Sequence, residues 1–137
     1  MTILRALPAL LFLTPAAAQA ATPIAGRWLT ADGSGVVTIG ACGGATCGRL
    51  TQILKVRPGA AATDVNNTDP ALRSRPIKGI AILSGFADKG KDWRGTIYDP
   101  RNGKSYKSIV VRNADGTLAV KGCIAFFCQT QTWTPAR

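Results

Sequence analysis

The sequence predicts an all-β protein that folds as a single antiparallel eight-stranded barrel. Short extended segments recur at near-regular spacing, and turn sequences such as Asp32-Gly33 and Asp115-Gly116 separate them. A chain of 137 residues has room for one domain and little room for a second. Closing the sheet into a barrel also removes the exposed strand edges that an open sheet of this size would present.

Eight segments have the composition and length of strands. Turn sequences rich in Asp, Asn and Gly lie between them, and these residues tolerate or prefer the left-handed backbone that tight turns require. The expected strands span residues 26–30, 35–39, 48–54, 79–86, 93–98, 106–112, 117–123 and 128–134.

Side chains alternate between the two faces of a strand, so the sequence also predicts which of them share a face. The predicted groups are Trp93 with Ile97, Thr96 with Tyr98, Gln129 with Gln131 and Trp133, and Ile80 with Ile82, Ser84 and Phe86. A barrel of about eight strands either fills with such side chains or holds one small ligand, and the sequence leaves both outcomes open.

A long connection, residues 57–78, interrupts this rhythm. Within it, Asp69 and Pro70 are expected to form the N-cap and first position of a short helix, and Pro76 ends the turn. A connection of this length inside a small domain is usually functional or disordered, and the short helix indicates order. We therefore expect an ordered loop that covers one end of the barrel.

The first twenty residues have the three parts of a secretory signal peptide. Arg5 lies in a short head, an apolar run follows, and the triplet Ala18-Gln19-Ala20 matches a signal-peptidase site. The run is shorter than the roughly 20 apolar residues that span a bilayer, so we expect no transmembrane segment after cleavage. The sequence therefore predicts a signal peptide of residues 1–20, cleavage after Ala20, a periplasmic or secreted location, and a barrel domain of residues 21–137.

The four cysteines form two Cys-x4-Cys pairs, Cys42 with Cys47 and Cys123 with Cys128. In an oxidising compartment they are expected to form disulfides. Four cysteines allow three pairings. Local bonds are favoured because each pair brackets four residues that suit a hairpin tip, and pairing between the two ends of the chain is the alternative. A four-cysteine zinc site would need reduced thiols and usually closer spacing.

The sequence lacks the residues of the commonest catalytic sites. It contains no His, and its seven acidic residues are all Asp. Serine-triad, Cys–His and His–zinc chemistries are therefore excluded. Six of the aspartates have a local duty in a turn, a helix cap or a strand start, and only Asp64 has none. We predict that the protein is not an enzyme.

Asp64, Asn66 and Thr68 resemble the start of a calcium-binding loop, in which oxygen ligands occupy alternate positions. The pattern then fails, because Asp69 stands where glycine is needed and Arg75 stands where a bidentate Glu belongs. Asx side chains that bond their own backbone explain the segment better. We therefore expect no metal and no cofactor.

The chain is basic, with 17 Lys and Arg against 7 acidic residues and a net charge of +10. Such an excess suggests nucleic acid when basic residues cluster among aromatic ones. Here they are scattered, with no run of three, so we expect no nucleic-acid partner. In an exported protein the charge favours anionic envelope surfaces instead.

Four motifs resemble one family of exported bacterial proteins. They are Gly26-Arg27-Trp28, the block DVNNTDPALRSRP at residues 64–76, Gly95-Thr96-Ile97-Tyr98-Asp99-Pro100 with Gly103-Lys104, and the ending from Gly122-Cys123 to Trp133-Thr134. Over essentially the whole mature chain, the sequence resembles the family called DUF2147. That family has no assigned activity, so the resemblance implies a bacterial, envelope-localised single domain and no particular reaction.

A weaker similarity connects the chain with lipocalin-like barrels. Gly26 and Trp28 match the Gly-x-Trp motif of their first strand, where the Trp packs across the closed end and an Arg often stacks on it. By position, Arg137 is the candidate for that Arg. Structural roles are also expected for Asp69 as a helix cap and for Trp133 in a packed core.

Two functions fit these observations. The first is an exported, non-enzymatic binder of a small amphipathic or anionic ligand, such as a small molecule or a lipid, held at one end of the barrel. Its candidate ligand-binding residues are Arg73, Arg75, Trp93, Tyr98 and Gln131. The second is a packed structural or interaction module that docks on anionic envelope components.

Overall fold

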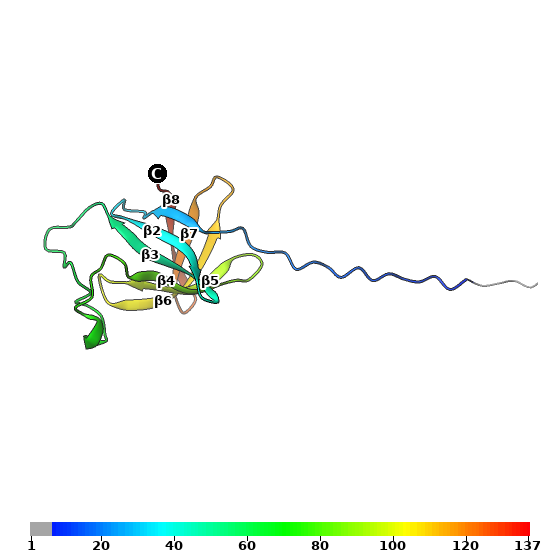
Figure 1. The fold of residues 1–137 in the computed structure, drawn as a ribbon, viewed down its shortest axis with the longest axis horizontal. Helices are drawn as coiled ribbons and strands as arrows, with labels where there is room; N and C mark the ends of the chain where they lie inside the picture. The colour runs from blue at the N-terminus through cyan, green and yellow to red at the C-terminus, as the bar shows by residue number, and fades with distance from the viewer. Residues whose placement is uncertain (1–6) are drawn as a thin grey trace, which may run out of the picture.

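Each strand of the computed structural model pairs antiparallel with its sequence neighbours, and β1 pairs with β8, so the sheet closes into a barrel (Figure 1). The structure describes residues 7–137. The strands are β1 (Gly26–Leu29), β2 (Gly35–Cys42), β3 (Ala45–Ile53), β4 (Ala81–Asp88), β5 (Trp93–Asp99), β6 (Lys104–Arg112), β7 (Leu118–Ile124) and β8 (Phe127–Pro135). The β3–β4 loop, residues 54–80, carries a short 3-10 helix, η1 (Pro70–Leu72). The predicted eight-stranded barrel with one long, helix-bearing loop is confirmed.

The β6–β7 turn shows why turn residues predicted the strand boundaries. Gly116 has a φ of 88°, which only glycine adopts without strain. The Asp115 carboxylate accepts a hydrogen bond from the backbone N–H of Thr117 at 3.0 Å, which closes the turn locally.

A bulge in β4 changes which side chains face the interior. The ladder with β5 shifts near Gly85, which has a φ of 63°. As a result, Leu83 and Phe86 are both buried at 1% exposure although they lie three residues apart. The predicted grouping of Ile80 and Ile82 with Phe86 is therefore wrong, because the extra residue of the bulge reverses the alternation.

Large apolar side chains fill the barrel. The buried cluster consists of Ile24, Trp28, Val37, Ile39, Leu83, Phe86, Val110, Leu118, Val120 and Trp133. Trp28 and Trp133 are each 2% exposed, as expected for core residues. Glycine makes room for this packing, because a Cβ at Gly95 would lie 2.6 Å from the Phe86 ring.

The start of β1 seals one end of the barrel, which we call the sealed end (Ile24, Trp28 and Arg112). The Trp28 indole donates a hydrogen bond to the Ile24 carbonyl at 2.9 Å, and Ile24 is 1% exposed. The Arg112 guanidinium lies 5.3 Å from the centre of the Trp28 ring. The cation that stacks on this Trp is thus Arg112 at the end of β6, whereas Arg137 is exposed.

Both disulfides are local, as predicted. Cys42 is bonded to Cys47 in the β2–β3 hairpin, and Cys123 is bonded to Cys128 in the β7–β8 hairpin. Each bond spans the tip of a hairpin, so two turns at different places in the barrel are covalently clamped.

The segment before β1 changes character at Ala21. Residues 7–20 are exposed, form no helix or strand, and extend away from the barrel (Figure 1). Ala21 is 7% exposed, and its backbone nitrogen donates to both carboxylate oxygens of Asp88 at 3.0 and 3.2 Å. Arg5, in the head of the predicted signal peptide, lies outside the described residues. Within residues 7–137, no helix has the length and apolar character needed to cross a membrane.

Candidate functional site at the open end of the barrel

The ladder between β8 and β1, which closes the barrel, is short. β1 has only four residues, and its ladder with β8 consists of the pairs Trp28–Pro135 and Leu29–Thr134. The first part of β8, residues 127–133, therefore pairs with β7 alone. We call the end of the barrel near this unpaired edge the open end; the β3–β4 loop, the β5–β6 turn and the β7–β8 tip surround it.

The inner face of β8 changes from apolar and buried to polar and exposed within four residues. Trp133 is 2% exposed, whereas Gln131 and Gln129, which share its face, are both exposed. Gln131 accepts a hydrogen bond from the Trp133 indole at 3.1 Å. A Cβ at Gly122, the ladder partner of Gln129, would lie 3.6 Å from Ile97, which packs against the core cluster, so this face is the interior.

Two partly buried side chains continue this inner surface on β5 and β6. Ile97 pairs with Tyr106, and Ile97 packs against the core cluster. The Tyr106 hydroxyl accepts a hydrogen bond from the Asn102 amide at 2.9 Å. The open end thus combines partly buried apolar side chains with amide and hydroxyl groups, a mixture that is usual in small-molecule sites.

A buried carboxylate, Asp64, anchors the β3–β4 loop to β5 next to the open end. Tyr98 donates a hydrogen bond to Asp64 Oδ1 at 2.5 Å, and Asn67 donates to Oδ2 at 2.9 Å. Arg75 completes the set, with Nε and Nη2 each 2.9 Å from Oδ2. Asp64 is 0% exposed, so the expectation that it has no structural duty is wrong. Its partners are hydrogen-bond donors, in contrast to the oxygen ligands of a calcium loop.

These contacts set the ionisation of both acidic groups. Burial opposes ionisation of Asp64, but the hydrogen bonds from Tyr98, Asn67 and Arg75, together with the Arg75 charge, lower its pKa below the usual value. Burial and the hydrogen bond to the Asp64 carboxylate raise the pKa of Tyr98 to about 12. The network is therefore a carboxylate and a neutral phenol over a wide pH range, a pairing that holds the loop in place.

The rest of the family motif fixes the loop against the β5–β6 turn. The Asn66 amide donates to the carbonyls of Pro100 and Arg101 at 3.2 and 3.1 Å. A Cβ at Gly103 would overlap the Asn66 carbonyl oxygen, so only glycine permits this approach. The loop packs on the outer face of β5, to which Tyr98 belongs. It therefore lies beside the open end, whereas the sequence interpretation placed it across that end.

The structure separates the candidate ligand-binding residues into three places. Arg75 and Tyr98 meet at Asp64, with 5.8 Å between the guanidinium and the centre of the Tyr98 ring, and Arg73 joins them through a 2.7 Å bond to the Asn67 carbonyl. Trp93 donates to the Thr22 carbonyl near the sealed end, and Gln131 lies on the inner face of β8. Ligand binding by these residues stays a prediction.

Sequence reasoning missed Tyr106, which gained significance only when the closure of the barrel placed it at the open end. Strand alternation did group Gln129 with Gln131 and Trp133, but it did not predict that Gln129 lies at this end. Asp64 did carry a signal, since it was the one aspartate without a local role and lies in the most specific motif. The predicted N-cap is confirmed, because the Asp69 side chain accepts a hydrogen bond from the backbone N–H of Ala71 at 3.0 Å. Gly26 has a φ of 140°, in keeping with its predicted structural role.

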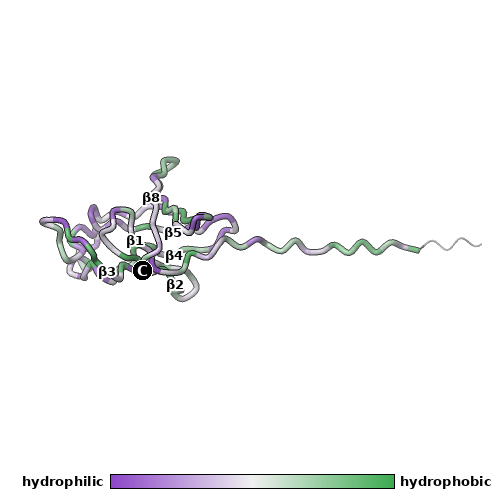
Figure 2. Tube along the Cα trace, turned by 90° about the horizontal axis from the view of Figure 1, so that it is seen from above, coloured by the Kyte–Doolittle hydropathy of each residue, from purple (hydrophilic) through white to green (hydrophobic). Residues whose placement is uncertain are grey.

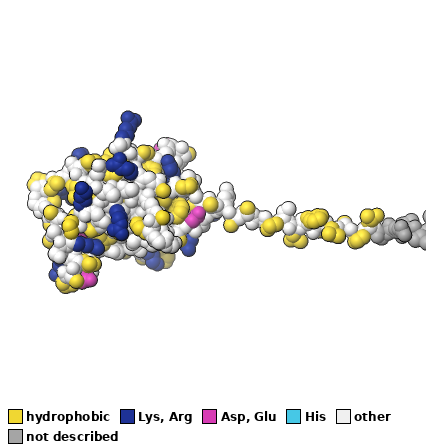
Figure 3. Space-filling view, viewed as in Figure 1, with side chains coloured by type: hydrophobic (Ala, Val, Ile, Leu, Met, Phe, Trp, Pro, Cys, Tyr) yellow, Lys and Arg dark blue, Asp and Glu magenta, His cyan; other side chains and the backbone are white. Residues whose placement is uncertain are grey.

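On the face shown in Figure 3, basic side chains form separate patches. At the β4–β5 turn, three basic residues and one acidic residue line a hollow of about 360 Å³: Lys89, Lys91, Arg94 and Asp92. The Asp92–Arg94 ion pair, at 2.9 Å, occupies part of this wall. The hollow is open and lies on the side of the molecule away from the open end.

An up-and-down eight-stranded barrel that one Trp-bearing strand seals at a single end has a lipocalin-like fold. The fold is similar to protein HP1028 from the human pathogen Helicobacter pylori, which is described as belonging to the lipocalin family; the TM-score is 0.72, the identity is 24%, and the match covers 84% of each chain. The sequence profile of the family described as "uncharacterized protein conserved in bacteria" (DUF2147) matches residues 26–135, and the chain belongs to that family. No curated protein matches the chain.

Proposed function

We propose that the protein is a non-enzymatic binder of a small amphipathic or anionic ligand, which it holds at the open end. The change along the inner face of β8, from buried Trp133 to exposed Gln131 and Gln129, carries this proposal. It means that side chains fill the interior at the sealed end and leave polar groups accessible at the other.

The residues at the open end match a ligand with an apolar body and a polar or charged head. Ile97 and the Tyr106 ring offer apolar surface, and the two Gln side chains offer amide donors. The net charge of +10 raises the local concentration of anions around the molecule. Arg73 is exposed beside this end and is a predicted contact for the head group, whereas Arg75 is held by Asp64.

A non-enzymatic role is also supported by the acidic groups. The sequence offers no His and no Glu, and Asp64, the most buried carboxylate, already has its oxygens occupied by Tyr98, Asn67 and Arg75. A general base needs an accessible lone pair near the substrate. Asp64 therefore acts as an anchor for the loop.

We further propose that the chain is exported and cleaved after Ala20. Two disulfides are typical of proteins that fold outside the cytoplasm. The change from exposed residues 7–20 to the anchored Ala21 coincides with the predicted cleavage site. Cleavage would convert the Ala21 nitrogen into an ammonium group already placed against the Asp88 carboxylate.

Native mass spectrometry of protein purified from the periplasm of the producing cell tests the binding proposal. A discrete added mass that denaturation removes is the expected result, and chemical analysis then gives the class of the ligand. If the protein carries no added mass and also fails to bind amphipathic anions such as anilinonaphthalene sulfonate, the proposal is wrong.

A further inference from the structure

The β7–β8 hairpin ends in an exposed apolar tip. Ile124, Phe126 and Phe127 are 67%, 105% and 77% exposed, and the hydrophobic tip projects from the body of the barrel (Figure 2). Single exposed apolar residues are common on proteins. Three large ones within four residues, on a convex projection, form a contact surface.

The backbone of the tip is strained in a way that the other turns avoid. Ala125 has a φ of 51°, and within residues 7–137 it is the one non-glycine residue with a positive φ. The β1–β2 and β6–β7 turns instead use Gly33 and Gly116 for this conformation. The Cys123–Cys128 disulfide spans the tip and holds it closed. The disulfide therefore holds a turn of apolar residues in a strained backbone conformation. Backbone strain that is kept in this way indicates a functional constraint.

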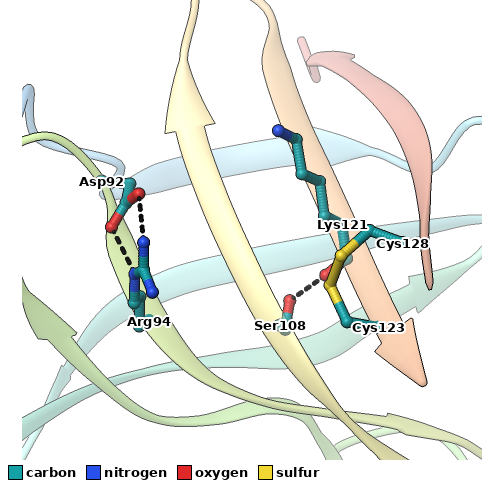
Figure 4. The surroundings of a disulfide bond; sticks show 6 residues. All are labelled: Asp92, Arg94, Ser108, Lys121, Cys123 and Cys128. Atoms are coloured by element: carbon teal, nitrogen blue, oxygen red, sulfur yellow. Dashed lines mark hydrogen bonds and ion pairs between the residues drawn. A yellow bond between two sulfur atoms is a disulfide. The ribbon is translucent and has the colours of Figure 1, made fainter. Parts of the chain in front are cut away.

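Two lysines lie on the outer face near the disulfide. Lys107 is the ladder partner of Cys123. Lys121 lies two residues before Cys123, and its ammonium group points away from the disulfide (Figure 4). Neither lysine forms an ion pair with any side chain in the described part of the chain, whereas the neighbouring Arg94 is paired with Asp92 at 2.9 Å. The apolar tip is thus backed by positive charge.

We propose that the β7–β8 hairpin docks the protein on an anionic lipid bilayer, with Phe126 and Phe127 entering the head-group region and Lys107 lying against lipid phosphates. A lipid surface deforms around a convex tip, so docking requires no preformed pocket in the partner. Apolar side chains with adjacent Lys are also the usual composition of interfacial anchors. The excess of basic over acidic residues favours an anionic surface and opposes association with a second copy of the chain. The tip is one of the segments around the open end, but Phe126, Phe127 and Lys107 are not among the residues assigned to ligand contact, so either proposal can fail without the other.

Vesicle flotation tests the docking surface. The chain from Ala21 is mixed with vesicles of phosphatidylethanolamine and phosphatidylglycerol in equal parts, and with phosphatidylcholine vesicles as a comparison. The double variant Phe126→Ser/Phe127→Ser should bind the anionic vesicles at least about tenfold more weakly, because it loses the two aromatic rings that the bilayer would bury. Lys107→Gln should weaken binding about fivefold and reduce the preference for anionic lipid. Lys121→Gln, at a lysine whose ammonium group points away from the tip, should have a smaller effect.

Val56→Ser is the matched control, because Val56 is an apolar side chain of the β3–β4 loop that is 73% exposed. Its vesicle binding should equal that of the unaltered chain. A Phe126→Trp variant reports insertion directly, since its added fluorescence should shift to shorter wavelength on anionic vesicles and be quenched by brominated lipid.

Three results would overturn the proposal. The first is no binding of the unaltered chain to anionic vesicles, and the second is equal binding by the double Ser variant. The third is concentration-dependent self-association without lipid that the double Ser variant abolishes, which would assign the tip to a second copy of the chain.

Discussion

The two ends of the barrel are built from the same strands but from opposite kinds of side chain. At the sealed end, Ile24, Trp28 and Trp133 are at most 2% exposed, and Arg112 covers the Trp28 ring. At the open end, the inner face of β8 presents exposed amides, and a polar network outside the barrel holds the adjacent loop. The difference indicates that packing at one end supplies stability, which leaves the other end free to present polar groups.

Truncation at the sealed end should have the largest effect on stability. Trp28→Ala removes a buried indole and its hydrogen bond to Ile24, so the free energy of unfolding should fall by about 3–5 kcal/mol. Gln129→Ala, at the open end, should change it by no more than about 0.5 kcal/mol, because Gln129 is exposed. Urea unfolding followed by far-UV circular dichroism measures both, and similar losses for the two variants would remove the distinction between the ends.

Loss of the Asp64 network should have an intermediate effect. Asp64→Asn removes the charge that Arg75 and Tyr98 bind, and unfolding free energy should fall by about 2–3 kcal/mol. Tyr98→Phe should cost about 1.5 kcal/mol, because it removes one hydrogen bond to a charged group. Asp69→Asn, in the same loop, is the control and should be near neutral because Asn is an equally good cap. An Asp64→Asn variant as stable as the unaltered chain would contradict the anchoring role.

Stability should depend on pH at both the acidic and the alkaline end of the range. The Asp64 network lowers the pKa of Asp64 in the folded state. In the β1–β2 turn, hydrogen bonds from Ser34 and Thr30 outweigh burial and lower the pKa of Asp32 to about 2. Their contributions are complete above the ordinary carboxyl pKa of about 4 and are lost as pH falls through the folded-state values. The raised pKa of Tyr98 contributes fully below about 10 and is lost as pH rises through about 12.

Unfolding experiments as a function of pH check both limits. Asp64→Asn should be less sensitive than the unaltered chain below about pH 4, and Tyr98→Phe should be less sensitive above about pH 10. Parallel pH profiles for the unaltered chain and the variants would mean that these groups do not interact in solution.

The smallest effect is expected where the chain enters the sealed end. In the chain that begins at Ala21, acetylation of the terminal amine should lower the free energy of unfolding by about 0.5–1 kcal/mol, because it removes the ion pair with Asp88. In the Asp88→Asn variant, acetylation should have no further effect. Independent, additive losses would show that the two groups are not paired.

Local sequence signals predicted the eight strands, the local disulfides and the cap at Asp69, because each depends on residues within a few positions of one another. Asp115-Gly116 is typical, since its turn closes on Thr117 two residues away. The bulge at Gly85 was not predictable from alternation, because glycine within a strand is compatible with either register.

The open end could not be predicted because it depends on contacts between distant parts of the chain. Tyr98 is 34 residues from Asp64. The exposure of Gln129 follows from the shortness of β1, a strand near the opposite end of the chain. Arg112 stacks on Trp28 for the same reason, because closure of the barrel brings β6 to the entry of β1. Sequence position alone favoured Arg137.

Titration with anilinonaphthalene sulfonate, an amphipathic anion, tests the functional difference between the two ends most directly. Gln131→Trp fills the open end from the inner face of β8, and Thr130→Trp places the same ring on the outer face one residue away. If the open end is the ligand site, Gln131→Trp should weaken binding at least about tenfold and Thr130→Trp should leave it unchanged. Equal affinities for the two variants, with both folded, would contradict the account.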